Sequence, residues 1–135
     1  MPGSAGTNRG LQLWVNLPRR LKKIEPEYQA VSADQMEERA CEGGRCRVID
    51  GGLKTRVTYL DVDFDGRFDL DIPAGENTLL YVLRGDVEVA KKKLSEKDAV
   101  VLSDGRLRSE GKARFVLLSA RPHKEPIRQR GPYVD

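Results

Sequence analysis

The sequence predicts a mostly β fold, a barrel or sandwich of short strands that follows an irregular N-terminal segment. From residue 45 onward, stretches rich in β-branched and aromatic residues alternate with turn signals such as Pro73-Ala74-Gly75. Apolar and polar side chains alternate within several of these stretches, which is the periodicity of strands. A helix-start signal occurs at Ser32-Ala33-Asp34-Gln35, and it predicts one short helix through Arg39.

The length and composition are those of one soluble globular domain. The chain has 135 residues, of which 39% are hydrophobic and 33% charged. Such a mixture is typical neither of disordered chains nor of membrane proteins. The N-terminus lacks the apolar core of a secretory signal, so a cytoplasmic location is expected by default. Abundant charge with few Asn and Gln gives a thermophile-like composition.

The sequence predicts a single domain, residues 1–135, with three parts. Residues 1–18 form an N-terminal arm and strand, residues 19–44 an irregular connection, and residues 45–135 the β-barrel. The strand in the first part is Leu11 to Leu17, because its apolar residues point one way and Trp14 the other. Those apolar residues are Leu11, Leu13, Val15 and Leu17. Pro18 ends the run because it cannot donate to a ladder.

The barrel strands are expected between successive turn signals. They are CRVI, TRVTYLDVDF, RFDLDI, TLLYVL, VEVA, AVVL, RLRSE and ARFVLLSA. The pair on either side of Asp65-Gly66 carries the motif D-x-D-x-D-G, which also opens the calcium loop of an EF-hand. That loop needs a bidentate Glu at its twelfth position, where this chain has Ile72. Apolar residues at even positions and aspartates at odd ones instead predict a half-buried strand pair across an Asp-Gly turn, with acids that discourage edge pairing.

The two cysteines, Cys41 and Cys46, stand in the sequence CEGGRC. Four zinc ligands cannot be assembled from them and the single histidine, His123. The glycines between them permit a tight turn, so a local Cys41–Cys46 disulfide is sterically reasonable. Two free thiols in a loop are the alternative, since cytosolic disulfides are rare outside hyperthermophiles.

Other chemistry finds little support in the residues. The net charge is only +3, and the triple Lys91-Lys92-Lys93 has no aromatic beside it, which argues against a nucleic-acid surface. No Ser/His/Asp set with a nucleophile elbow and no phosphate-binding loop is visible. No run of apolar residues is long enough to cross a membrane. Catalytic and cofactor-binding residues are therefore not assigned.

Three segments resemble one known family, the pirins. RGLQLWVNLP (residues 9–18) followed by IEPEYQ is similar to the junction after the first pirin domain. TYLDVDFDGRFDLDIPAGENTLLYVLRGDVEV resembles the opening strands of the C-terminal cupin domain, and EPIRQRGPYVD resembles the closing segment of the family. The resemblance implies a single cupin-like jelly-roll barrel that corresponds to the C-terminal half. Pirins are related to quercetin dioxygenases, and their metal site of three His and one Glu lies in the N-terminal domain.

The metal ligands of that family have no counterparts here. When DIPAGENTLLYVLRGDV is aligned with the metal-bearing cupin motif, its histidine positions fall on Asp71 and Pro73 and its glutamate position on Asn77. No histidine follows before His123. Non-haem iron requires imidazole and carboxylate ligands around an open position. A metal site and a cofactor are therefore not expected in this chain.

These observations favour a pirin-like interaction or structural module without metal or catalysis of its own. The expected partner is a second copy of the chain, bound through the strand Leu11 to Leu17, because that strand would otherwise expose apolar side chains and unpaired backbone. The alternative is a subunit of a split pirin, whose separate metal-bearing cupin chain would give quercetin 2,3-dioxygenase-like or iron-dependent regulatory activity. A gene fragment or misassigned start codon also remains open.

Overall fold

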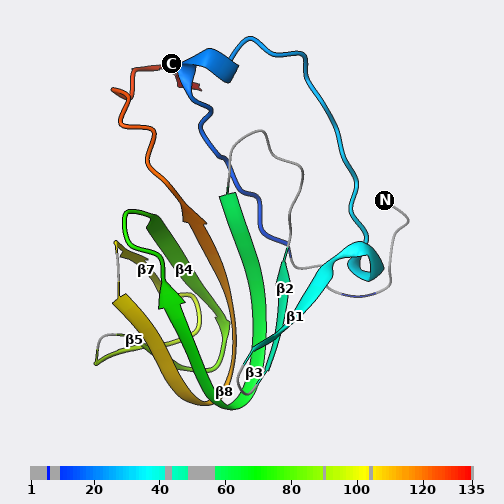
Figure 1. Ribbon diagram of the computed structural model, residues 1–135, viewed down its shortest axis with the longest axis vertical. Helices are drawn as coiled ribbons and strands as arrows, with labels where there is room; N and C mark the ends of the chain where they lie inside the picture. The colour runs from blue at the N-terminus through cyan, green and yellow to red at the C-terminus, as the bar shows by residue number, and fades with distance from the viewer. Residues whose placement is uncertain are drawn as a thin grey trace. The chain divides into compact units, whose positions relative to one another are not determined.

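The computed structural model describes Gly6 and residues 10–41, 44–48, 57–89, 91–103 and 105–134 (Figure 1). Two compact units are present, one formed by Glu25–Lys124 and the other by Met1–Ile24 together with Glu125–Asp135. Strands dominate the described residues, so the predicted mostly β class is confirmed. The prediction that residues 1–135 form one domain stays a prediction.

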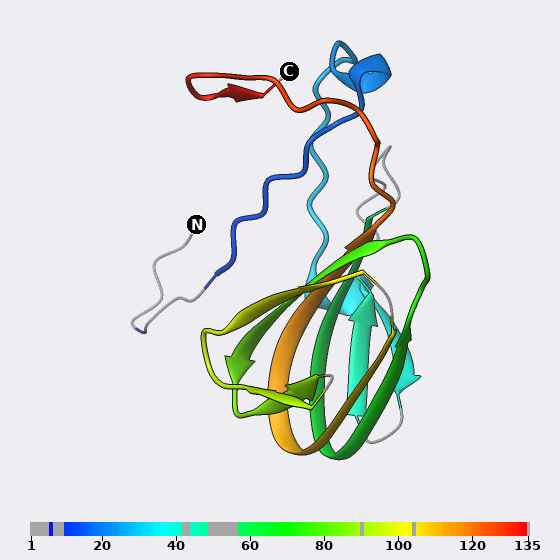
Figure 2. The ribbon, with the colours of Figure 1, turned by 90° about the vertical axis from the view of Figure 1, so that its left-hand side faces the viewer.

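The larger unit is an antiparallel sheet that curls around an apolar interior (Figure 2). Its eight strands are β1 (Glu37–Cys41), β2 (Gly44–Val48), β3 (Val57–Ile72), β4 (Asn77–Arg84), β5 (Val87–Val89), β6 (Lys92–Leu94), β7 (Ala99–Leu102) and β8 (Gly105–Ala120). Along the sheet the order is β1-β2-β3-β8-β4-β7, and β5 pairs with β6 and β8 beside this path. Strands β1 and β7 therefore end the row at its two edges.

Strands β3 and β8 form the central ladder, and each is 16 residues long. They pair continuously from Val57 opposite Ala120 to Ile72 opposite Gly105. Both strands bend at the same rung, where Gly66 lies opposite Gly111 with φ of 118° and 114°. Positive φ is easily reached by glycine, so the ribbon folds over the interior without interrupting the ladder.

The predicted hairpin turn at Asp65-Gly66 is wrong, because β3 bends there but continues as one strand. The same holds at Gly111, where two predicted strands are one. A local Asp-Gly signal predicts a turn, but β3 and β8 pair along their whole lengths instead. The aspartate strand also lies between β2 and β8, so the acids do not protect an edge.

The N-terminal part of this unit differs from the prediction in its elements. Residues Ala33–Gln35 form only a short 3₁₀ helix, η2, which is capped by a reciprocal box between Ser32 and Gln35. The predicted helix does not continue to Arg39, since Glu37 already begins β1. Pairing of β1 with β2 provides partners that a single helical turn cannot, so the irregular connection 19–44 contains a strand. The predicted turn at Asp50-Gly51-Gly52 lies outside the described residues.

The smaller unit joins the two ends of the chain. It holds the 3₁₀ helix η1 (Arg19–Leu21) and a hairpin of β9 (Gln129–Arg130) and β10 (Tyr133–Val134). The backbone N–H of Arg19 donates to Oε2 of Glu125 at 2.8 Å. Residues 9–18 and the closing segment EPIRQRGPYVD, which carry part of the pirin resemblance, thus belong to one unit. No helix among the described residues is long and apolar enough to span a membrane.

The predicted strand Leu11 to Leu17 is not formed in the structure of the single chain. These residues belong to no strand in the structure, and no described strand pairs with them. Their alternating pattern supplies two faces, but a strand exists only where a neighbour accepts its backbone hydrogen bonds.

Candidate functional site

The barrel interior, where a cupin would hold its ligand, is filled by aromatic side chains. Phe64 and Phe68 of β3 pack against Phe115 of β8, with ring centroids 5.4 Å to 6.1 Å apart. All three rings are at most 1% exposed. Tilted and edge-on contacts at such distances are the favourable geometries for aromatic pairs. The space is therefore a packed core rather than a binding chamber at this level of the barrel.

Aliphatic side chains complete this core. Strands β3, β4, β5 and β8 contribute aliphatic side chains that are fully buried. These include Val62, Leu80, Val82, Val87 and Leu107. The even-numbered apolar residues of β3 are buried or partly buried, as the alternation in the sequence predicted; they are Leu60, Val62, Phe64, Phe68, Leu70 and Ile72.

The positions aligned with cupin metal ligands lie on the surface. The side chain of Asp71 is 83% exposed, and Pro73 and Asn77 are exposed as well. His123 is exposed beyond the end of β8. Within the described ranges, no three His, Cys, Asp or Glu side chains gather as a metal-binding group would. A proline and an amide at two of the three positions do not fit the imidazole-rich set that non-haem iron needs.

One end of the interior carries a polar chain of side chains. Oγ1 of Thr78 lies 2.8 Å from Oγ of Ser119, and both residues are buried. The Ser119 hydroxyl donates to Oε2 of Glu76 at 2.6 Å, which leaves the Thr78 hydroxyl to donate to Ser119. Each buried hydroxyl is thereby satisfied, which avoids the cost of an unpaired polar group. This set closes that end of the core with hydrogen bonds.

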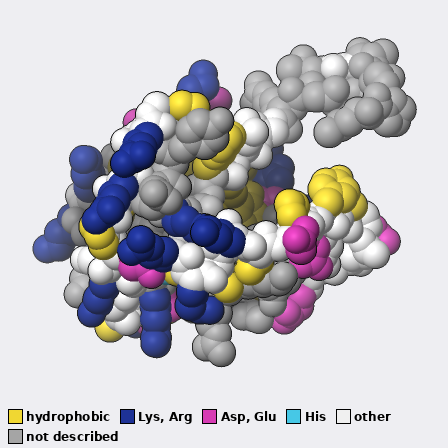
Figure 3. Space-filling model, turned by 90° about the horizontal axis from the view of Figure 1, so that it is seen from above, with side chains coloured by type: hydrophobic (Ala, Val, Ile, Leu, Met, Phe, Trp, Pro, Cys, Tyr) yellow, Lys and Arg dark blue, Asp and Glu magenta, His cyan; other side chains and the backbone are white. Residues whose placement is uncertain are grey.

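The aspartates of β3 form ion pairs with basic side chains of neighbouring strands. Asp61 accepts two hydrogen bonds from Arg114, at 3.0 Å and 2.6 Å. Lys112 lies 2.7 Å from Asp65, and Arg106 binds Asp69. Figure 3 shows acidic and basic side chains next to one another on the surface that it presents. Of the acids that resembled a calcium loop, Asp61 and Asp65 thus have basic partners on β8, and Asp63 lies 3.6 Å from Arg84 of β4.

These contacts shift the protonation equilibria of the groups involved. The hydrogen bond from Arg106 is the largest cause that lowers the pKa of Asp69, whose side chain is only 7% exposed. The hydrogen bond with Asp61 raises the pKa of Arg114. Burial, and then the charge of Asp61, raise the pKa of Tyr59. All three shifts favour the protonation states that these groups already have at neutral pH, with Asp69 and Arg114 charged and the Tyr59 phenol neutral.

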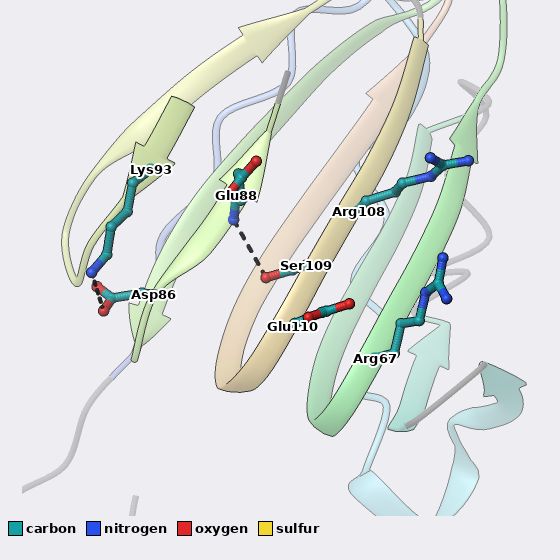
Figure 4. A pocket seen from close by; sticks show the side chains of 7 residues that line it. All are labelled: Arg67, Asp86, Glu88, Lys93, Arg108, Ser109 and Glu110. Carbon is teal, nitrogen blue, oxygen red and sulfur yellow. Dashed lines mark hydrogen bonds and ion pairs between the residues drawn. The ribbon is translucent and has the colours of Figure 1, made fainter. Parts of the chain in front are cut away.

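A polar groove of about 490 Å³ lies beside the glycine bend. Its lining residues, drawn in Figure 4, are Arg67, Asp86, Glu88, Lys93, Arg108, Ser109 and Glu110. Lys93 binds Asp86 at 2.9 Å and Arg108 binds Asp69 at 3.4 Å, while the Ser109 hydroxyl accepts the Glu88 N–H at 3.3 Å. Three cations and three anions line the groove, so the lining has no net charge.

Sequence reasoning missed this groove. Its residues come from β3, β5, β6, β8 and the turn before β5, and only the register of β8 brings them together. One signal was present in the sequence. Arg67 faces Glu110 across the ladder, which reverses the acid-on-β3, base-on-β8 order of the neighbouring rungs. Without the register, that reversal cannot be recognised.

The structure places the two cysteines on adjacent strands. Cys46 of β2 is 1% exposed and belongs to the core, and its Cα partner on β1 is Arg39. Cys41 pairs with Gly44, two positions further along the hairpin. The side chain of Cys41 lies outside the described residues, so the Cys41–Cys46 disulfide stays a prediction.

Four of the five residues proposed for a dimer strand have exposed apolar side chains. Leu11, Leu13 and Val15 are 41% to 45% exposed, and Trp14 is 86% exposed. Leu17 is partly buried. Exposed apolar groups that cluster, as these do along the sequence, mark interaction surfaces.

Comparisons with known proteins agree with this architecture. Residues 58–135 match the family model of the pirin C-terminal cupin domain. The chain is 34% identical to rat (Rattus norvegicus) pirin over 154 residues, which covers 99% of the chain and 53% of that protein. It is 35% identical to a pirin-like protein of Caulobacter vibrioides, over 96% of the chain and 53% of that protein.

A solved structure with the same fold is the quercetin 2,3-dioxygenase of Acinetobacter baumannii. The TM-score is 0.75 at 30% identity, and the match covers 90% of this chain and 48% of that one. The chain thus spans about half the length of these relatives. The matched family model, the jelly-roll strands and the resemblance of the segments at both ends lead to one conclusion: the chain belongs to the pirin family and corresponds to its C-terminal cupin domain.

Proposed function

We propose that this pirin-like cupin acts as an interaction module and that its own barrel carries no catalysis. The observation that supports the proposal most directly is the interior, where Phe64, Phe68 and Phe115 occupy the space in which a cupin ligand would sit. The surface positions of Asp71, Pro73 and Asn77 give further support.

The partner in this proposal is a second copy of the chain, bound through Leu11, Leu13, Trp14, Val15 and Leu17. The exposure of these side chains supports an association that covers them. A two-fold dimer is the simplest closed arrangement, since it leaves no copy of the segment uncovered. Burial of the apolar area contributes about 25 cal/mol per Å² before the costs of association are subtracted.

The test combines metal analysis with an activity assay on the purified chain. After chelator treatment, we expect substoichiometric iron, zinc and copper by mass spectrometry and no oxidation of quercetin. Light scattering in dilute solution is expected to give the mass of a homodimer. A metal held at about one per chain, together with quercetin oxidation that Asp71→Ala abolishes, would refute the non-catalytic role.

A second function is supported by the length comparison. The quercetin 2,3-dioxygenase of A. baumannii is about twice as long as the part that matches this chain. We infer from this that a separate metal-bearing cupin chain could complete a split pirin, with quercetin oxidation or iron-dependent regulation as its activity. Co-expression with a His-rich cupin chain encoded nearby distinguishes the two functions. A stable complex that oxidises quercetin, while neither chain does so by itself, would favour the split enzyme.

A further inference from the structure

Strand β7 is the edge of the barrel that lacks protection against pairing. It contains Ala99, Val100, Val101 and Leu102, without a charged side chain, and pairs with β4 alone among the described strands. The opposite edge, β1, begins with Glu37 and Glu38, and natural edge strands commonly use such charges to discourage pairing. An uncharged edge is an acceptor for a further strand.

The outer face of the sheet carries an apolar row that ends at this edge. The row runs across four neighbouring strands through Tyr59, Leu118, Leu79 and Val101, which are Cα partners in register. The first three side chains are partly buried, whereas Val101 at the edge is 68% exposed. A strand added next to β7 would continue this row and cover Val101.

The inner face of β7 is also incompletely covered. Val100 and Leu102 pack against the core cluster but remain partly exposed. A strand that fits beside β7 therefore needs apolar groups on both of its faces.

The segment Leu11 to Leu17 has this pattern. It is uncharged and belongs to no strand. Its aliphatic residues Leu11, Leu13, Val15 and Leu17 alternate with a face formed by Gln12, Trp14 and Asn16. In the register that places the aliphatic side chains beside Val101, Trp14 faces Val100 and Leu102. Seven residues also exceed the four of β7, so the whole edge can be paired.

We propose that Leu11–Leu17 of one copy adds to the free edge of β7 in a second copy, and that the exchange is reciprocal. This inference rests on the homodimer proposed above and names the acceptor surface for its strand. A two-fold exchange forms two identical interfaces and extends both sheets by one strand.

The test uses three full-length variants and light scattering over a concentration series. Val101→Lys blocks the acceptor edge, and the double variant Leu13→Lys/Val15→Lys blocks the donor segment. Tyr28→Lys is the matched control, because Tyr28 is 91% exposed and lies outside both segments. We expect each blocked variant to raise the dimer Kd at least tenfold and the control to leave it unchanged. Circular dichroism shows whether each variant retains its strands, and Val101→Glu, which also places a charge on the edge, replaces Val101→Lys if the latter does not fold.

Mixing the two blocked variants gives the decisive measurement. One retains an intact donor and the other an intact acceptor, so a mixture is expected to form a heterodimer through one interface although each variant by itself is monomeric. A wild-type monomer overturns the proposed homodimer and this inference together. A wild-type dimer that Val101→Lys leaves intact, or blocked variants that do not complement, overturns only the β7 acceptor. Hydrogen-exchange protection of residues 11–17 and 99–102 in a monomer would show pairing within one chain and overturn the exchange between copies.

Discussion

Truncation of Phe115 tests whether the barrel interior is a packed core. Phe115 is fully buried and contacts both Phe64 and Phe68. Phe→Ala changes at such sites cost about 3–5 kcal/mol. The two ring contacts, each worth roughly 0.5–1.5 kcal/mol, place Phe115→Ala toward the upper end of that range. Since single domains have a free energy of unfolding of about 5–15 kcal/mol, the variant is expected to lose a third or more of its stability.

Urea unfolding followed by far-UV circular dichroism measures this loss. Tryptophan fluorescence is a poor probe, because Trp14 is 86% exposed and belongs to the other unit. Ile127→Ala is the control, since Ile127 is 77% exposed, and it is expected to change stability by less than about 0.5 kcal/mol. If Phe115→Ala does not fold, Phe115→Leu is expected to lose roughly 1–2 kcal/mol. A loss below about 1 kcal/mol in Phe115→Ala would show that the interior tolerates a cavity, and the argument against a ligand chamber would fail.

Two further predictions concern the backbone and the ionic ladder. Gly85→Ala is expected to lose at least about 1–2 kcal/mol more than Gly75→Ala in the same unfolding assay. Both glycines have positive φ (76° and 80°), but only at Gly85 would the new Cβ lie 2.3 Å from the Lys112 carbonyl oxygen, so equal losses would contradict the reasoning. The hydrogen bond from Arg106 lowers the pKa of Asp69 in the folded state. The ionised Asp69 carboxylate therefore stabilises the fold fully above the unfolded pKa of about 3.9, and this stabilisation is lost as the pH falls through the folded pKa. The stability difference between wild type and Asp69→Asn is therefore expected to shrink between pH 7 and pH 2, and a pH-independent difference would contradict this assignment.

The alternation of residues predicted which side chains of β3 enter the core. Leu60, Val62, Phe64 and Phe68 occupy even positions and are buried, because successive side chains of a strand point to opposite faces. The same reasoning assigned the aspartates to the outer face. Similarity in three segments predicted the family and the fold, both of which the comparisons confirm.

Local patterns could not predict where the strands are continuous. Asp65-Gly66 has the composition of a turn, yet Gly66 bends within β3 because Gly111, 45 residues later, bends opposite it. The converse holds for Leu11 to Leu17, which has the pattern of a strand but pairs with no strand among the described residues. Strand pairing depends on residues far away in sequence, so periodicity identifies the faces of a strand but not its neighbour.

The sequence by itself determined the β class, the inward face of the aspartate strand and the family. The tertiary structure decided which charges meet, since the register of β8 brings Arg114 to Asp61 and Arg106 to Asp69. It also placed Glu110 opposite Arg67 beside the polar groove. Composition and spacing specify local propensity. The contacts that form a groove or an open edge instead depend on which strands lie side by side. The neighbours of each strand are decided by the packing of the whole sheet around its core.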